Sequence, residues 1–180
     1  FSRIETSFGG KLRSDEIYDL RANILAGEVR QKIFNGFTKA CHTLYKFDSN
    51  TERMFAIVLE NDKEVLKWMR PSPKQFNIYY GPGGMSKYEP DFIVEAKDKI
   101  YMVETKASNE MESATVKEKA AAAVVYCDAV SAWNAENGGK PWEYALISHD
   151  EVRLNSSLKY LVSNHASYVQ LGLEGITEQQ

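Results

Sequence analysis

The chain has 180 residues, of which 43% are hydrophobic and 26% charged, and its formal net charge at pH 7 is −3. These values are ordinary for one soluble globular domain with an ample core. They count against a domain that binds DNA unaided, because such affinity comes largely from lysines and arginines that neutralise phosphates.

No window is apolar and long enough for a membrane span or a signal peptide. The two cysteines, Cys41 and Cys127, are far apart, which predicts neither a disulfide framework nor a zinc site. We therefore expect a protein of the reducing cytoplasm without a membrane partner. Because the chain begins at Phe1 rather than Met, we read it as part of a longer protein.

Residues 1–13 show no periodicity and are expected to form a loop. From Ser14 the pattern becomes helical, since Ser14 can cap a helix and apolar residues recur mostly at helical spacing as far as Ile33. Residues 1–47 are thus predicted to be a helical segment packed on the core, with no chemistry of its own.

The next helix is predicted to begin at residues 48–52. Ser49, followed three residues later by Glu52, matches a capping box, and one of two open interpretations of Glu52 is that it serves only to satisfy amide groups of the first turn. Glu60 and Glu64, further along this helix, are expected to face solvent.

Phe76 to Tyr80 is predicted to be the first strand of the core, and the glycine-rich residues 81–87 are predicted to be a turn between strands.

A β-hairpin is predicted from two apolar runs, Phe92 to Ala96 and Ile100 to Thr105, on either side of a short charged segment. If Asp98 and Lys99 form the turn, residues at equal distances on either side of it should pair across the two strands. The expected pairs are Val94 with Val103, Ile93 with Glu104 and Asp91 with Lys106. Period-two alternation then gives one core face and one face that carries Asp91, Glu104 and Lys106.

A long helix is predicted from Ser113 to Asn137, where Gly138 provides a stop, and a buried strand from Pro141 to Ser148. A strand, helix and strand in sequence imply a crossover, so the last strand should lie parallel to the one that ends in Lys106. Of Lys117 and Lys119, one is expected to face water, and the other can reach a phosphate. His149 is expected in a surface loop rather than as a general base, and a short helix and a disordered tail should follow.

The hairpin carries the candidate chemistry. The carboxylates of Asp91 and Glu104, with the main-chain carbonyl of Thr105 between them, form a hard oxygen site suited to Mg²⁺. Lys106 can hold a water molecule there and favour its deprotonated form. This combination suits metal-assisted hydrolysis of a phosphodiester.

Pro90-Asp91, followed by Glu104-Thr105-Lys106 at the end of the next strand, resembles the PD-(D/E)xK nuclease superfamily. A longer pattern, over roughly Arg21 to Asp150, is similar to the C-terminal endonuclease region of the restriction subunit of type III restriction enzymes. The segments that carry it are Lys46–Ser49 with Glu52, Phe55-Ala56, Trp68, Tyr88, Lys119–Ala122, Tyr126-Cys127 and Lys140–Tyr144.

The resemblance implies an α/β fold, a restriction-endonuclease-like mixed sheet flanked by helices. It places a nuclease core at 48–150, between the helical segment 1–47 and a C-terminal helix and tail at 151–180. It implies a site-specific endodeoxyribonuclease that uses Mg²⁺, with Mn²⁺ as a substitute. In that enzyme Asp91 and Glu104 bind the metal, Glu52 adds an outer ligand through water, and Lys106 activates the nucleophile.

The implied partners are double-stranded DNA, a helicase motor in the same parent chain, and a methyltransferase modification subunit. Two alternatives stay open. One is a non-catalytic, nuclease-like docking module that packs against a motor or a methyltransferase. The other is the nuclease of a repair or phage-defence helicase.

Overall fold

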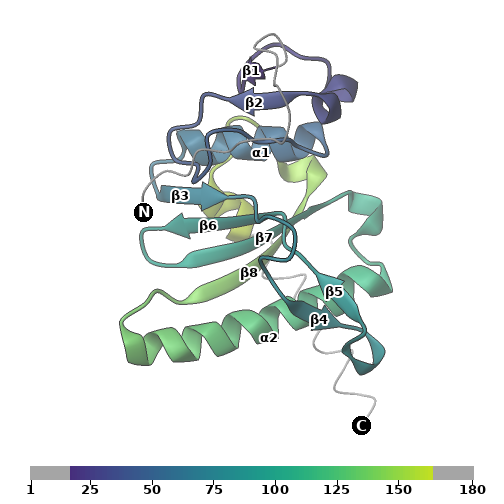
Figure 1. Ribbon diagram of the computed structural model, residues 1–180, viewed down its shortest axis with the longest axis vertical. Helices are drawn as coiled ribbons and strands as arrows, with labels where there is room; N and C mark the ends of the chain where they lie inside the picture. Colours follow the sequence, from purple (N-terminus) through teal and green to yellow (C-terminus); the bar gives the residue numbers. More distant parts are fainter. Residues whose placement is uncertain (1–16, 164–180) are drawn as a thin grey trace.

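The structure is a computed structural model that describes residues 17–163. Its centre is a four-stranded mixed sheet in the order β3-β6-β7-β8, with helix α1 on one face and helix α2 on the other (Figure 1). This confirms the predicted mixed α/β fold. The bounds are β3 Val65–Met69, β6 Phe92–Ala96, β7 Ile100–Lys106, β8 Trp142–Ser148, α1 Asn50–Asn61 and α2 Ala114–Asn137.

The predicted N-terminal helical segment is wrong for residues 17–47. Strand β1 (Ile17–Asp19) pairs in parallel with β2 (Ile33–Asn35), and the connection contains the short 3-10 helix η2 (Ala26–Gln31). Tertiary packing explains the difference, because the apolar side chains of this region insert into the core around α1 from short strands, loops and the 3-10 helix η2, and this packing overrides the helical spacing. Those side chains are Leu20, Val29, Phe34, Phe37, Tyr45 and Phe47. Ser14, the expected cap, lies outside the described residues.

Helix α1 begins as predicted. The hydroxyl of its N-cap, Ser49, accepts a hydrogen bond from the Glu52 N–H at 3.1 Å. The solvent-facing assignment of Glu60 is wrong, since only 6% of this residue is exposed. Its carboxylate binds the chain segment 38–40 and the Trp68 indole of β3, which joins three parts of the fold.

The predicted hairpin forms, with its register displaced by two residues. Phe92 pairs with Val103 and Ile93 with Met102. The Ala96 N–H donates to the Lys99 carbonyl at 2.9 Å, so the turn is at residues 97–98. Lys99 follows this turn, and its ammonium lies 2.7 Å from the Glu143 carboxylate of β8. A shift of two residues preserves which side chains share a face.

The first strand of the main sheet is β3, antiparallel to β6, rather than the predicted segment 76–80. Within that segment β4 (Ile78–Tyr80) pairs with β5 (Ser86–Tyr88) in a separate two-stranded sheet. The predicted turn between them contains the short 3-10 helix η3 (Pro82–Gly84). In β3 the side chains of Val65 and Trp68 are buried in the core that α1 covers, and this burial fixes the strand in the sheet.

The sheet is buried on both faces, whereas the alternation predicted only one apolar face. Phe92, Val94 and Val103 pack toward α1, and Ile93 and Met102 pack in a second core with α2. The second core exists because α2 crosses back over the sheet to β8, which is parallel to β7 as predicted. Only the ends of the strands are left for polar chemistry.

Helix α2 has the predicted limits. It is capped by Ser113 and ends at Gly138, which has the left-handed conformation (φ 73°). After β8 come the short 3-10 helix η5 (His149–Glu151) and helical residues 158–163. The predicted disordered tail lies outside the described residues. No helix in the described range combines the length and apolar character that crossing a bilayer requires.

Candidate active site

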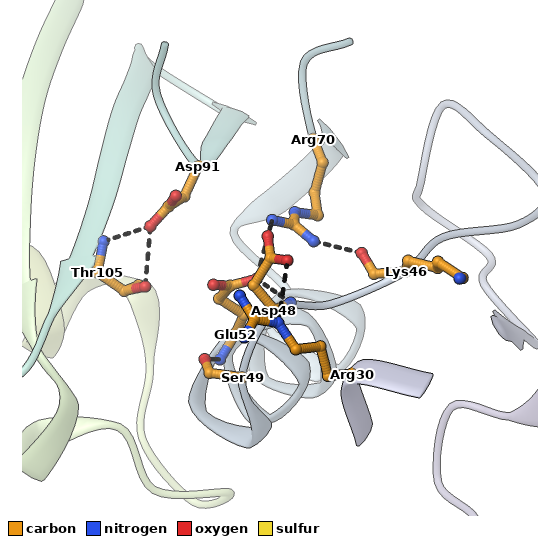
Figure 2. A network of polar contacts seen from close by, with 8 residues as sticks. All are labelled: Arg30, Lys46, Asp48, Ser49, Glu52, Arg70, Asp91 and Thr105. Carbon is orange, nitrogen blue, oxygen red and sulfur yellow. Dashed lines mark hydrogen bonds and ion pairs between the residues drawn. The ribbon is translucent and has the colours of Figure 1, made fainter. Parts of the chain in front are cut away.

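Asp91 lies immediately before β6, beside the end of β7. Its Oδ2 atom accepts two hydrogen bonds from Thr105, one from the backbone N–H and one from the hydroxyl, each 2.9 Å long (Figure 2). The hairpin therefore brings the Asp-containing segment and the Glu-Thr-Lys segment together, as the sequence predicted. Thr105 thus contacts Asp91 through its amide and hydroxyl groups, whereas the sequence predicted a role for its main-chain carbonyl.

Glu104 is buried near the end of β7, with 6% of the residue exposed. Within residues 17–163 neither its Oε2 atom nor the nearby Tyr88 hydroxyl forms a hydrogen bond that meets geometric criteria, although this hydroxyl is close enough to lower the pKa of Glu104. Burial, and then the negative charge of Asp91, raise the pKa of Glu104 to about 7, although Lys106 and Lys119 oppose this rise. A buried carboxyl oxygen without a partner is costly to maintain unless a ligand engages it.

Lys106 ends β7, two residues after Glu104. Its Nζ atom lies 3.6 Å from Glu104 Oε1, and the lysine side chain is 27% exposed. The lysine is thus held beside the buried carboxylate and remains accessible from solvent. A group that binds and orients water needs both properties.

One carboxylate oxygen of Glu52, on α1, makes both a hydrogen bond and an ion pair. Its Oε2 atom accepts a hydrogen bond from the Asp48 N–H at 2.9 Å and lies 2.8 Å from Arg70 Nη2 (Figure 2). Burial raises its pKa, the Arg70 charge lowers it, and the Asp91 charge raises it again. Glu52 therefore caps the helix and also feels the charge of Asp91.

The Asp91 charge acts on both Glu104 and Glu52, so the four predicted residues share one region. They do not form a closed ligand cage: within residues 17–163 no three Asp, Glu, His or Cys side chains are grouped so that they could hold a metal ion. The donor set nevertheless consists of hard oxygen atoms, and one of them, Glu104 Oε2, is buried and unpartnered. These residues fit a small divalent cation.

Of the two lysines near the start of α2, Lys119 is the one that lies near the candidate site. Its Nζ atom lies 5.7 Å from the centre of the Tyr80 ring and 6.0 Å from that of Tyr88, and its charge lowers the pKa of Glu104. Lys117 instead pairs with Glu112 at 2.8 Å, and its side chain is half-exposed. Helical spacing alone could not choose between the two lysines, because the choice depends on how α2 is rotated against the sheet.

His149 also belongs to this region, contrary to the expected surface loop. It follows Ser148, which pairs with Lys106 across the parallel strands, and it is partly buried. Burial lowers the pKa of His149; the Asp91 charge opposes this shift, and the Lys106 charge adds to it. The predicted parallel pairing of β7 and β8 could have indicated this position of His149, because parallel strands end at the same edge of a sheet.

A family model described as "Endonuclease domain" matches residues 38–130, just over half of the chain. No curated protein and no solved structure matches the chain. The matched segment includes Glu52, Asp91, Glu104 and Lys106, and it continues into α2 as far as Val130. The chain belongs to the endonuclease domain family and is a restriction-endonuclease-like nuclease.

Proposed function

We propose that this domain is a Mg²⁺-dependent, site-specific endodeoxyribonuclease that hydrolyses phosphodiester bonds of double-stranded DNA. One observation carries the proposal. Glu104 places a buried oxygen without a partner in the described structure beside a second carboxylate, Asp91, and a lysine, Lys106. Such a combination of a perturbed carboxyl, a neighbouring acid and an accessible lysine is typical of a hydrolytic site.

The residues that would hold the metal are Asp91, Glu104 and the carbonyl of Thr105, with Glu52 as an outer ligand through water. When bound, Mg²⁺, or Mn²⁺ in its place, supplies charge neutralisation and activation of water. Glu52 already contacts Arg70 and the Asp48 N–H, so it would contribute through its other oxygen.

The protein groups have separable tasks. Thr105 holds the Asp91 carboxylate through two hydrogen bonds. Lys106 is placed to orient the attacking water, and its positive charge favours the deprotonated form of that water. Glu104 fixes the lysine through their 3.6 Å ion pair.

The wider setting is proposed by resemblance to the restriction subunit of type III enzymes. There the domain would act in the cytoplasm, be joined to a helicase motor in the same parent chain, and work with a methyltransferase modification subunit. The net charge of −3 supports this setting, because a motor that already holds DNA removes the need for a strongly basic nuclease domain.

The test combines metal binding with cleavage. Titration calorimetry of the chain with Mn²⁺ should show at least one bound ion, and Glu104→Ala should abolish that binding. DNA cleavage in Mg²⁺ should be lost in both Asp91→Ala and Lys106→Ala, with circular dichroism unchanged. Lys97→Ala is the matched control, since this lysine is exposed and pairs only with Glu64 in the described structure.

Full cleavage by either Asp91→Ala or Lys106→Ala would contradict the site assignment. Absence of both metal binding and cleavage in the wild-type chain would favour a nuclease-like docking module instead.

A further inference from the structure

A cavity of about 370 Å³ opens directly beside Asp91. Its lining includes side chains from the segment before α1, from the end of β3 and from the segment before β6. Among them are Leu44, Lys46, Arg70, Ser72, Pro73 and Asp91. Its volume is at the lower end of the range of roughly 300–1,000 Å³ that is usual for small-molecule sites. This size suits one nucleotide.

The basic side of the cavity is built from Arg70 and Lys46. Arg70 is a fixed cation: its guanidinium lies near both Glu52 and Asp48, donates to the Lys46 carbonyl, and packs over the rings of Phe47 and Phe92. Its side chain keeps 16% exposure. Lys46 is exposed, and within residues 17–163 its ammonium forms no ion pair. The cavity thus has one rigid cation and one that is available to a ligand.

The other walls suit the rest of a nucleotide. Leu44 and Pro73 give apolar surface for a sugar or a base, and the Ser72 hydroxyl adds a polar group. The acidic residue Glu89 also lines the cavity, but its carboxylate accepts a hydrogen bond from the Lys74 N–H at 2.5 Å. Asp91 is the single lining residue that belongs to the proposed metal site, so it marks where the cavity meets the chemistry.

We propose that this cavity binds the nucleotide next to the scissile phosphate of the cleaved strand. Lys46 contacts its second phosphate, and the apolar wall formed by Leu44 and Pro73 receives its sugar and base. The inference rests on the proposed nuclease function and adds a subsite to it.

The probe is thymidine 3′,5′-bisphosphate, a single nucleotide with one phosphate for the metal and one for the cavity. Its binding to the 180-residue chain is measured by calorimetry in Ca²⁺, which avoids turnover. Lys46→Ala should weaken binding about tenfold, since a hydrogen bond to a charged group is lost. Ser72→Trp, which fills the cavity from an exposed loop position, should weaken it at least as much.

Two variants are matched controls. Lys97→Ala removes an exposed lysine outside the cavity, and Leu154→Trp adds an indole at an exposed position outside it. Both should bind the nucleotide as the wild type does. In DNA cleavage, Lys46→Ala should raise KM more than it lowers kcat, because it loses a binding contact and no reacting group.

Unchanged nucleotide binding in both Lys46→Ala and Ser72→Trp would overturn the subsite, and so would a wild-type chain that binds Ca²⁺ but not the nucleotide. Either result could accompany normal DNA cleavage, which would leave the proposed function standing. Failure of the proposed function itself is recognised separately, by loss of metal binding and cleavage in the wild-type chain.

Discussion

Thr105 binds Asp91 twice, through its backbone N–H and through its hydroxyl, at 2.9 Å in each case. Thr105 stands between Glu104 and Lys106, so the same short stretch of β7 orients one carboxylate and carries the other. In the segment Glu104-Thr105-Lys106, the middle residue therefore positions Asp91, the acid that precedes the neighbouring strand.

The first prediction concerns this hydroxyl. Thr105→Val keeps the shape and the backbone bond and removes one hydrogen bond. The domain should lose about 1 kcal/mol of unfolding free energy, and cleavage should fall as Asp91 becomes free to rotate. Thr105→Ser retains the hydroxyl and should restore most of the activity. Urea unfolding and cleavage rates measure the two effects, and equal activity in Val and Ser variants would show that the hydroxyl does not position Asp91.

The second prediction concerns stability against pH in metal-free protein. The pKa of Glu104 is raised from 4.5 to about 7, first by burial and then by Asp91. Between these values the folded state binds more protons than the unfolded state, so the unfolding free energy falls as pH rises through this window. The total loss is about 3 kcal/mol, since one pKa unit corresponds to about 1.4 kcal/mol.

Glu104→Gln should remove this slope and leave the variant more stable than the wild type at pH 8. Urea unfolding from pH 4.5 to 8 in EDTA measures it. Glu112→Gln, at a carboxylate whose side chain is 70% exposed, should keep the wild-type slope. A Glu104→Gln curve parallel to the wild type would contradict the assigned burial effect.

The third prediction separates the two roles of Glu52. Ser49→Ala removes the N-cap hydroxyl and should lower the unfolding free energy by about 1 kcal/mol, with cleavage intact at low temperature. Glu52→Gln keeps the size of the side chain but removes the charge paired with Arg70. If Glu52 also serves the metal, cleavage should fall well beyond the effect of Ser49→Ala, and the Mg²⁺ concentration needed for half-maximal rate should rise. Equal cleavage in the two variants would leave capping as its role.

The fourth prediction concerns Glu60, which accepts hydrogen bonds from Thr38, Lys39, Ala40 and the Trp68 indole. Burial raises its pKa, but these donors outweigh burial and lower it overall. Glu60 therefore stabilises the fold above its unfolded pKa, and this stability is lost as pH falls through its lower folded pKa.

Glu60→Gln should lower the unfolding free energy by roughly 2–4 kcal/mol at pH 7, because an amide cannot accept all these bonds and buried donors are left unpaired. Thermal or urea unfolding measures it. Glu64→Gln, at an exposed position, should change stability by less than about 0.5 kcal/mol. Similar losses in both variants would contradict the buried role of Glu60.

Local chemistry in the sequence predicted much of the core. The Ser49 cap, the Gly138 stop, the hairpin and the parallel relation of β7 and β8 all depend on residues close in sequence or on general rules of chain connection. The Asp91 segment and the Glu104-Thr105-Lys106 segment were brought together correctly for the same reason, since a hairpin joins neighbours.

Other features depended on contacts between distant segments. The alternation in β6 could not show that α2 would bury its second face, and helical spacing before residue 33 gave no sign of the β1–β2 pair. The hairpin register also differs from the one predicted locally, and in the observed register Lys99 pairs with Glu143 of the distant strand β8. Sequence position likewise gave no indication that Glu60 would be enclosed by residues 38–40.

By itself, the sequence determined that one hairpin presents Asp91, Glu104 and Lys106 together. Only the tertiary structure decided how each is set: Glu104 buried with one oxygen unpartnered in the described structure, Glu52 tied to Arg70, and Lys119 rather than Lys117 beside the site. The physical reason is that burial and electrostatic environment arise from side chains far apart in the chain, whereas helix caps, turns and strand alternation arise from near neighbours.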